Sequence, residues 1–559
     1  MVTQRPWPWW QAFDWNGVLC LKEWSVPRMP MKPGLNSGFG RASLVPGLLQ
    51  KAMVLHERGD LQQAGRIYQQ ILQLSPKHFD AMHLLAVVNA QFGQHTKARA
   101  LFVKALALQP GHAEAHFNKG TMEWAAGKLA TAVADFDLAI RSVPDHAGAL
   151  NNRSLVLQGM QRFDEALLDN NRLIELVPND PTFRNNRGTL LHDMMRLDEA
   201  LACFNEAISL RPDYVEALNN RGNVLKDMHR IDEALSDYDS AITADADFAG
   251  APFNKSIALL LRGDFETGWA LWEWRWRQTK LSSPKRNFKQ PLWGGDSDIA
   301  GKTILLHSEQ GLGDTVQFIR YVPMVADLGA RVVVEAPESL HPLLTAMKGI
   351  DHLIGKHDTL PTFDLHCPLM SLPLAFKTTL ETIPASTSYL AVSPDRIEDW
   401  SQRLGTSSRP RVAVAWRGNP NNSNDHNRSA RLDDIAHHLS PEFDWICLHH
   451  DLDKSERQLA RSLPHLRVPL AKSTNLEDAA AICVLSDLVV SVDTSFAHIA
   501  GALGKTSLVM LSFTPDWRWM LDRADSPWYP AMTLFRQDKT RDWGQVMEDV
   551  AEALRKVTR

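Results

Sequence analysis

Small, aromatic and turn-forming residues recur every 34 positions through the first half of the chain. Each period has a small residue. Four positions later stands a residue that is aromatic in most periods, and eight positions after that stands a proline. Residues four apart share one face of a helix, so the small and aromatic positions form one packed stripe. Proline ends a helix because it has no backbone N–H to donate. The pattern predicts pairs of short helices, closed by Pro76, Pro110, Pro144, Pro178 and Pro212.

This period is typical of tetratricopeptide repeats, in which each unit buries its apolar face only by stacking on its neighbours. We predict such an α-solenoid over residues 45–280, with about seven units. The last unit, from about residue 250, is degenerate. The first 44 residues are rich in Trp, Pro and Gly and have no helical period, so we expect a poorly ordered extension there.

A second 34-residue series lies on the first helix of the units: Asn118, Asn152, Asn186, Asn220 and Asn254. Two interpretations are open. One is a ladder that hydrogen-bonds the backbone of an extended polypeptide, an arrangement that resembles the superhelix of the protein O-GlcNAc transferases. The other is a consensus residue that contacts the neighbouring repeat.

Beyond residue 280 the pattern changes to short β-branched runs separated by helical segments. Such runs predict buried strands of parallel sheets. The expected strands are TILLH (303–307), RVVVE (331–335), RVAVA (411–415), WICL (445–448), LVVSV (488–492) and SLVML (507–511). We predict two doubly wound α/β halves, residues 281–405 and 406–559, that face a cleft. Ligands of such sheets bind beyond the carboxyl ends of strands, so site residues should follow strands.

Two loops meet this condition. The first is GLGD, in which Gly311 and Gly313 permit a sharp turn and Asp314 could accept a proton from an acceptor hydroxyl. The alternative for Asp314 is a helix N-cap. The second is SVDTSFAHIAGALGK (491–505), where a strand ends in Asp-Thr-Ser and a helix opens. Free N–H groups and hydroxyls at a helix N-terminus favour a phosphate.

GLGD followed by D-T-x-x-A-H-x-A-G-A-L-G resembles the heptosyltransferases, glycosyltransferase family nine, which have the GT-B fold. The resemblance extends from about residue 300 to the C-terminus. It implies inverting transfer from a nucleotide-diphosphate sugar, with no metal and no other cofactor. It implies Asp314 as the catalytic base and a donor site formed by Asp493, Thr494, Ser495 and His498. Arg428 or Arg431 would pair with phosphate oxygens, and the predicted donor site also includes Trp416, Gly418 and Asn419 of AWRGNP (415–420).

Composition narrows the class of protein. The 559 residues carry a formal net charge of −5, which does not favour binding to nucleic acid. The five cysteines are far apart and form no C-x-x-C pair, so we expect a reducing, cytoplasmic environment. No apolar run reaches transmembrane length.

Two functions from different classes remain. The first is a glycosyltransferase whose solenoid recruits the acceptor, which we expect to be a protein or peptide. The second is an interaction scaffold whose transferase domain has lost turnover.

Overall fold

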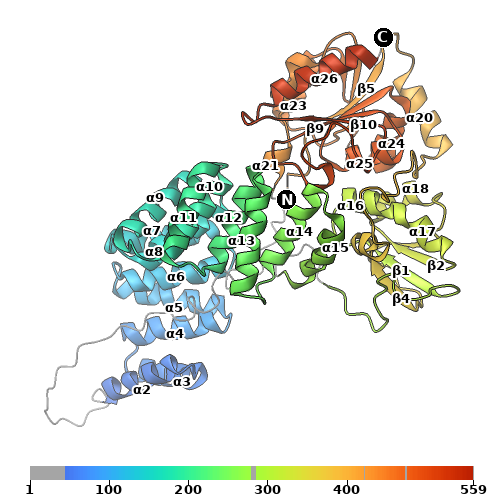
Figure 1. Cartoon of the computed structure of the whole chain (residues 1–559). Coiled ribbons are helices and arrows are strands. Elements are labelled where there is room, and N and C mark those ends of the chain that lie inside the picture. Colours follow the sequence, from blue (N-terminus) through green and yellow to red (C-terminus); the bar gives the residue numbers. More distant parts are fainter. Residues whose placement is uncertain (1–43, 279–284, 421, 423, 472–474, 558–559) are drawn as a thin grey trace. The chain divides into compact units, whose positions relative to one another are not determined.

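The computed structural model describes residues 44–278, 285–420, 422, 424–471 and 475–557, so residues 1–43 of the predicted extension lie outside the described part. Its first region is a run of helices that alternate between 13 and 14 residues, as the 34-residue period requires (Figure 1). They are α2 (Val45–Glu57), α3 (Leu61–Leu74), α4 (Phe79–Gln91), α5 (His95–Leu108), α6 (Ala113–Ala125), α7 (Leu129–Ser142), α8 (Ala147–Gly159), α9 (Phe163–Leu176), α10 (Pro181–Asp193), α11 (Leu197–Leu210), α12 (Val215–Asp227), α13 (Ile231–Ala244), α14 (Gly250–Arg262) and the shorter α15 (Phe265–Trp272). The predicted tetratricopeptide solenoid is confirmed.

The two helices of a pair cross closely because one of them has a residue without a side chain, glycine, at the crossing point. A Cβ placed on Gly120 would lie 2.8 Å from the Phe136 ring, and one on Gly188 would lie equally close to Phe204. Non-bonded carbon atoms do not approach this closely, so the aromatic ring fills the space that glycine leaves. Both rings are completely buried.

The chain divides into two compact units, Met1–Val224 and Leu225–Arg559, and the division falls inside α12. The second unit therefore contains the last solenoid helices, α13 to α15, as well as the whole α/β region. Within this unit, the Trp269 indole of α15 donates a hydrogen bond to the carbonyl of Thr378 at 3.1 Å.

The α/β region contains two parallel sheets. The first has the strand order β3-β2-β1-β4. Its strands are β1 (Thr303–His307), β2 (Arg331–Glu335), β3 (His352–Ile354) and β4 (Leu365–Pro368). β1 lies between β2 and β4, so the strand order reverses beside β1 and the loop that follows it lies at the switch point.

The second sheet has the order β10-β9-β8-β5-β6-β7. Its strands are β5 (Arg411–Ala415), β6 (Asp444–Cys447), β7 (Leu466–Arg467), β8 (Leu488–Val492), β9 (Ser507–Leu511) and β10 (Met532–Arg536). The chain runs outward from β5 to β7 and then returns to place β8 on the other side of β5. The switch point is therefore between β5 and β8.

Helices cover both faces of the second sheet. Figure 1 shows α23 (Lys454–Ser462) and α26 (Trp543–Val557) on one side, and α24 (Leu476–Leu485) and α25 (Ser495–Ala502) on the other. Apolar residues of α26 pack with the strand valines in one buried core. Two doubly wound halves of this kind make the GT-B fold, as predicted. Within the described residues no helix is long and apolar enough to cross a membrane.

Candidate active site

The two loops predicted as site loops meet in the structure, although they follow strands of different sheets. The first leads from β1 through residues 308–311 into α16 (Leu312–Phe318), and the second leads from β8 into α25. A Cβ on Gly313 would lie 2.8 Å from Cδ2 of His498. Position 313 therefore has room only for glycine while the His498 ring occupies its place. This contact brings the first turn of α16 against α25.

Asp314 is the third residue of α16, and Gly311 is the N-cap. This corrects the alternative in which Asp314 itself caps the helix. Its Oδ2 accepts the backbone N–H of Gly311 at 2.8 Å, which is the return bond of a capping box. Its Oδ1 forms an ion pair with Arg518. The side chain is 20% exposed, so a ligand can still reach it.

Arg518 is a site residue that the sequence did not predict. It lies in a 3₁₀ turn, Trp517–Trp519 (η8), and its guanidinium is buried. Its Nη2 contacts Asp314, its Nη1 donates to Asp516 at 2.7 Å, and its Nε donates to the Gln317 side chain at 2.5 Å. Arg518 thus lies in a turn of the half that contains the second sheet, and it binds α16 of the half that contains the first sheet. The only sequence signal was the stretch DWRW (516–519), in which charged and aromatic residues alternate.

Asp493 follows β8 directly and is partly buried. Burial, and after it the neighbouring Asp516, raise the pKa of the Asp493 carboxyl to about 6. Arg428 and Arg518 oppose this shift. The site therefore gathers three carboxylates, Asp314, Asp493 and Asp516, with two guanidinium groups.

His498 lies one turn into α25 and is buried. Its Nδ1 shares a hydrogen bond of 2.8 Å with the Tyr529 hydroxyl, and its ring stacks on Trp519 with centroids 5.5 Å apart. Burial lowers the pKa of His498 well below its usual range, and nearby arginines add to the effect. His498 is therefore neutral near pH 7. It packs the two loops together and does not supply positive charge to a ligand.

The hydroxyl groups at the start of α25 differ in availability. Thr494 is the N-cap, and its buried hydroxyl accepts the backbone N–H of Phe496 at 3.2 Å. That hydroxyl is therefore used by the helix itself. Ser495 is the first residue of the helix and is partly exposed, so its hydroxyl remains accessible.

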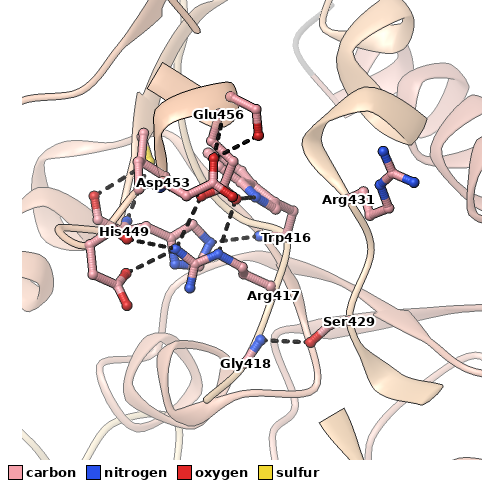
Figure 2. Close-up of polar contacts among 12 residues, drawn as sticks. Trp416, Arg417, Gly418, Ser429, Arg431, His449, Asp453 and Glu456 are labelled. Atoms are coloured by element: carbon pink, nitrogen blue, oxygen red, sulfur yellow. Dashed lines mark hydrogen bonds and ion pairs between the residues drawn. The ribbon is translucent and has the colours of Figure 1, made fainter. Parts of the chain in front are cut away.

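The loop after β5 contributes Gly418 and Arg428. Gly418 donates its backbone N–H to the Ser429 hydroxyl at 2.8 Å (Figure 2). A Cβ on Gly418 would lie 2.6 Å from Oδ1 of Asp425 and 2.7 Å from Nη2 of Arg428, so a larger residue here would displace these two side chains. Arg428 lies close enough to Asp493 to lower its pKa, which agrees with its predicted place in the site. Asn419 is exposed on the same loop.

One predicted donor residue, Trp416, is corrected by the structure, and a second, Arg431, stays a prediction. Trp416 is 0% exposed. Its indole N–H donates to Glu456 at 3.0 Å, and its ring packs on His449, so it is a core residue with no surface for a ligand (Figure 2). The Arg431 side chain is 76% exposed and pairs with Asp433 at 3.4 Å. Figure 2 shows it apart from the polar cluster around Trp416.

The asparagine series contacts neighbouring repeats. The side-chain amide nitrogens of Asn118, Asn152, Asn186 and Asn220 lie 2.9, 3.3, 3.3 and 3.0 Å from His83, Thr121, Asn151 and Asn185, respectively. Each partner belongs to the first helix of the preceding repeat. Asn254 is partly buried on α14 in the second unit. These bonds favour the interpretation of a consensus residue between repeats over a peptide ladder.

We therefore expect replacement of Asn152, Asn186 and Asn220 by Ala to lower the melting temperature. Each inter-repeat hydrogen bond contributes about 0.5–1.5 kcal/mol. Differential scanning calorimetry of the single and triple variants measures the effect. Asn89→Ala is the control, because its amide donates to Leu85 of its own helix. Lost capture of a protein acceptor at unchanged melting temperature would instead favour the peptide ladder.

Family comparisons agree with this architecture. Tetratricopeptide repeat models match residues 55–117, 93–147, 118–181 and 215–248, and a TPR repeat model matches residues 196–229. The glycosyltransferase family 9 (heptosyltransferase) model matches residues 445–552. The family 9 match includes Asp493, His498 and Arg518, whereas Asp314 lies outside it.

One curated protein and several solved structures are similar to parts of this chain. Protein FlbA of Caulobacter vibrioides is 24% identical, over 54% of this chain and 54% of that protein, so the chain spans about half the length of this relative. Among solved structures, a tetratricopeptide repeat protein from Parabacteroides merdae is 18% identical, with a TM-score of 0.37 over 41% of this chain and 91% of that one. PilF of Pseudomonas aeruginosa is 20% identical, with a TM-score of 0.33 over 37% and 94%. At such TM-scores neither structure carries a functional inference. The family matches identify the chain as a tetratricopeptide-repeat protein joined to a glycosyltransferase family 9 domain.

Proposed function

We propose that the α/β region transfers a sugar from a nucleotide-diphosphate sugar to an acceptor hydroxyl, with inversion and without a metal ion. The family 9 match supports a glycosyltransferase. The observation that carries the proposal is the contact of Gly313 with His498. It joins the loop that bears Asp314 to the helix that follows Asp493, and both loops lie at the switch points of their sheets.

In the proposed reaction Asp314 is the general base. Its carboxylate accepts the proton of the acceptor hydroxyl while the acceptor oxygen attacks the anomeric carbon of the sugar. The bond from that carbon to the diphosphate oxygen breaks, and its electron pair leaves with the nucleoside diphosphate. Arg428 and Arg518 are the nearby cations that would offset the charge of the leaving group. Ser495 offers its hydroxyl at the start of α25.

We further propose that the acceptor is carried by a protein that the solenoid binds. Because the asparagine series contacts neighbouring repeats, other side chains of the solenoid would bind this partner. The described cysteines, Cys203, Cys367, Cys447 and Cys483, are free and buried, which suits the reducing environment of the cytoplasm.

One observation favours a second candidate, a nucleotide-binding scaffold without turnover. Both oxygens of Asp314 already have partners, Gly311 and Arg518. A base held in this way must exchange at least one partner for the acceptor hydroxyl. Turnover in the presence of a nucleotide sugar separates the enzyme from the scaffold.

Calorimetric titration with ADP, UDP, GDP and CDP in the presence of EDTA tests the donor site. We expect at least one of them to bind. Incubation of the protein with the matching nucleotide sugars and a cell lysate, followed by mass spectrometry, then identifies a product. No binding of any of the four would contradict the donor site, and binding without a product would support the scaffold.

A titration with a nucleotide sugar should depend on pH through Asp493. Because the pKa of its carboxyl is raised to about 6, the group is ionised above that pH and repels a diphosphate. Affinity for a nucleotide sugar should therefore rise as the pH falls through about 6. Asp493→Asn should bind with little change over this range, whereas an unchanged pH dependence in the variant would exclude Asp493 as its cause.

A further inference from the structure

A completely buried arginine lies at the end of the solenoid. Arg275 belongs to the 3₁₀ turn Glu273–Arg277 (η3), which follows α15 directly, and it is 0% exposed. Burying a guanidinium costs several kcal/mol unless it is paired and hydrogen-bonded. Its partners therefore show what the residue holds in place.

The main partner of Arg275 is a carboxylate in the loop that precedes Asp314. Its Nη2 lies 3.0 and 3.2 Å from the two carboxylate oxygens of Glu309 and donates to the Ser371 hydroxyl at 2.7 Å. Its Nη1 donates to Glu273 at 2.6 Å. The guanidinium also lies over the Trp276 ring, 4.5 Å from its centroid. Arg275 is thus held from several sides.

Glu309 is the other half of this buried pair. Burial raises the pKa of its carboxyl to about 7, and Arg275 opposes that shift. Glu309 stands two residues after β1 and two before Gly311, whose N–H binds Asp314. The loop of residues 308–311 is therefore anchored at one end by Arg275. At its other end Asp314 is held by Arg518.

The same part of the solenoid contacts the helix of Asp314 a second time. Trp269 of α15 packs edge-on against Phe318, the last residue of α16, with ring centroids 6.4 Å apart. It also packs edge-on against Trp517, the neighbour of Arg518, at 5.3 Å. α15 and the turn after it thus contact both elements that bear the Asp314–Arg518 pair.

We propose that Arg275 is a positioning residue for the transfer reaction and that the end of the solenoid is a working part of the active site. Through Glu309 it fixes the loop of residues 308–311, and the loop fixes the start of α16 and the carboxylate of Asp314. This inference rests on the proposed transferase function. It implies that the solenoid does more than recruit the acceptor.

Arg275→Met tests the proposal in the full-length protein, with Arg277→Met as the matched control. Arg277 belongs to the same turn and stacks over Trp274 at 4.2 Å, but it is exposed. We expect Arg275→Met to lower kcat by about 10²-fold, since displacing a reacting group by about 1 Å has this effect. Donor affinity should change little, because the donor residues are on the other half. Arg277→Met should keep normal kcat.

Hydrogen exchange provides a readout that needs no activity. Peptides that cover residues 308–318 should exchange faster in Arg275→Met than in the wild type or in Arg277→Met. Arg275→Lys, which keeps the charge but loses the forked geometry, should give an intermediate kcat. The double variant Arg275→Met, Glu309→Gln should be no slower than Arg275→Met, because both changes remove one pair.

Normal exchange of this loop in Arg275→Met and in Arg275→Lys would overturn the proposal. So would a loss of kcat that accompanies an equal loss of nucleotide-binding stoichiometry, since that would show only a smaller folded fraction. A wild-type protein that transfers no sugar would contradict the proposed function. In that case the exchange experiment would still decide whether Arg275 fixes the loop.

Discussion

Replacement of Asp314 by Asn should lower turnover by about 10²–10⁴-fold, the usual contribution of a general base. An amide cannot accept the proton of the acceptor hydroxyl at neutral pH. Its oxygen can still accept the N–H of Gly311, so the capping of α16 should survive. Donor affinity should change little. Initial rates with a nucleotide sugar, together with calorimetric titration of the donor, measure the two quantities.

Asp358→Asn is the matched control for this prediction. Asp358 accepts the backbone N–H of Gly355 at 2.7 Å, in the same Gly-x-x-Asp spacing, and it is exposed. The control variant should therefore keep normal turnover. Near-normal turnover of Asp314→Asn would show that Asp314 only supports the turn and its ion pair. Asp493 would then be the next carboxylate to test as the base.

The strands that the sequence predicted are those buried by neighbours on both sides. β1, β2, β5, β8 and β9 have the predicted bounds, and β6 (Asp444–Cys447) begins and ends one residue earlier than predicted. A central strand is buried on both faces and between two neighbours, so it must be a short run of apolar residues. That requirement is visible in a single sequence.

The strands that the sequence did not predict all lie at the edges of their sheets. They are β3, β4, β7 and β10. β3 has three residues and β7 has two. An edge strand pairs on one side only and tolerates charged, proline and exposed residues, so its local pattern is weak. LHCP of β4 and MTLFR of β10 are of this kind.

The sequence predicted those site residues whose place depends on their position after a strand. It did not predict those whose place depends on packing. Asp314 and Asp493 follow central strands, and parallel strands bring such residues to one edge of each sheet. Trp416 also follows a central strand, but its large apolar ring is more stable in the core than in a loop. Arg518 follows no strand. Its place depends on Asp314 and Gln317, and no local pattern records such distant partners.

Replacement of Arg518 by Gln should destabilise the second unit strongly. Removing one partner of a buried ion pair typically costs 3–5 kcal/mol, because the remaining charge stays buried without a partner. Here Asp314 and Asp516 are partly exposed, so we expect about 3 kcal/mol, the lower end of that range. The variant also loses the contacts to Asp314 and Gln317 that join the two halves of the α/β region.

Arg523→Gln is the control for this loss of stability. Arg523 forms two hydrogen bonds with Asp525, at 2.9 and 2.6 Å, but the pair lies at the surface. Exposed pairs contribute only about 0–1 kcal/mol, so this variant should unfold close to the wild type. Added salt should weaken the Arg523 pair and affect the buried Arg518 pair much less.

Urea unfolding followed by tryptophan fluorescence measures both variants. Between residues 44 and 224 the sequence has a single tryptophan, Trp124, whereas Trp517 and Trp519 flank Arg518 directly. Of the tryptophan fluorescence that arises beyond residue 43, most therefore comes from the second unit. An Arg518→Gln midpoint equal to that of Arg523→Gln would contradict a buried pair. A lower midpoint with unchanged turnover would leave Arg518 as a purely structural link. Because its guanidinium contacts the proposed base directly, we expect stability and turnover to fall together.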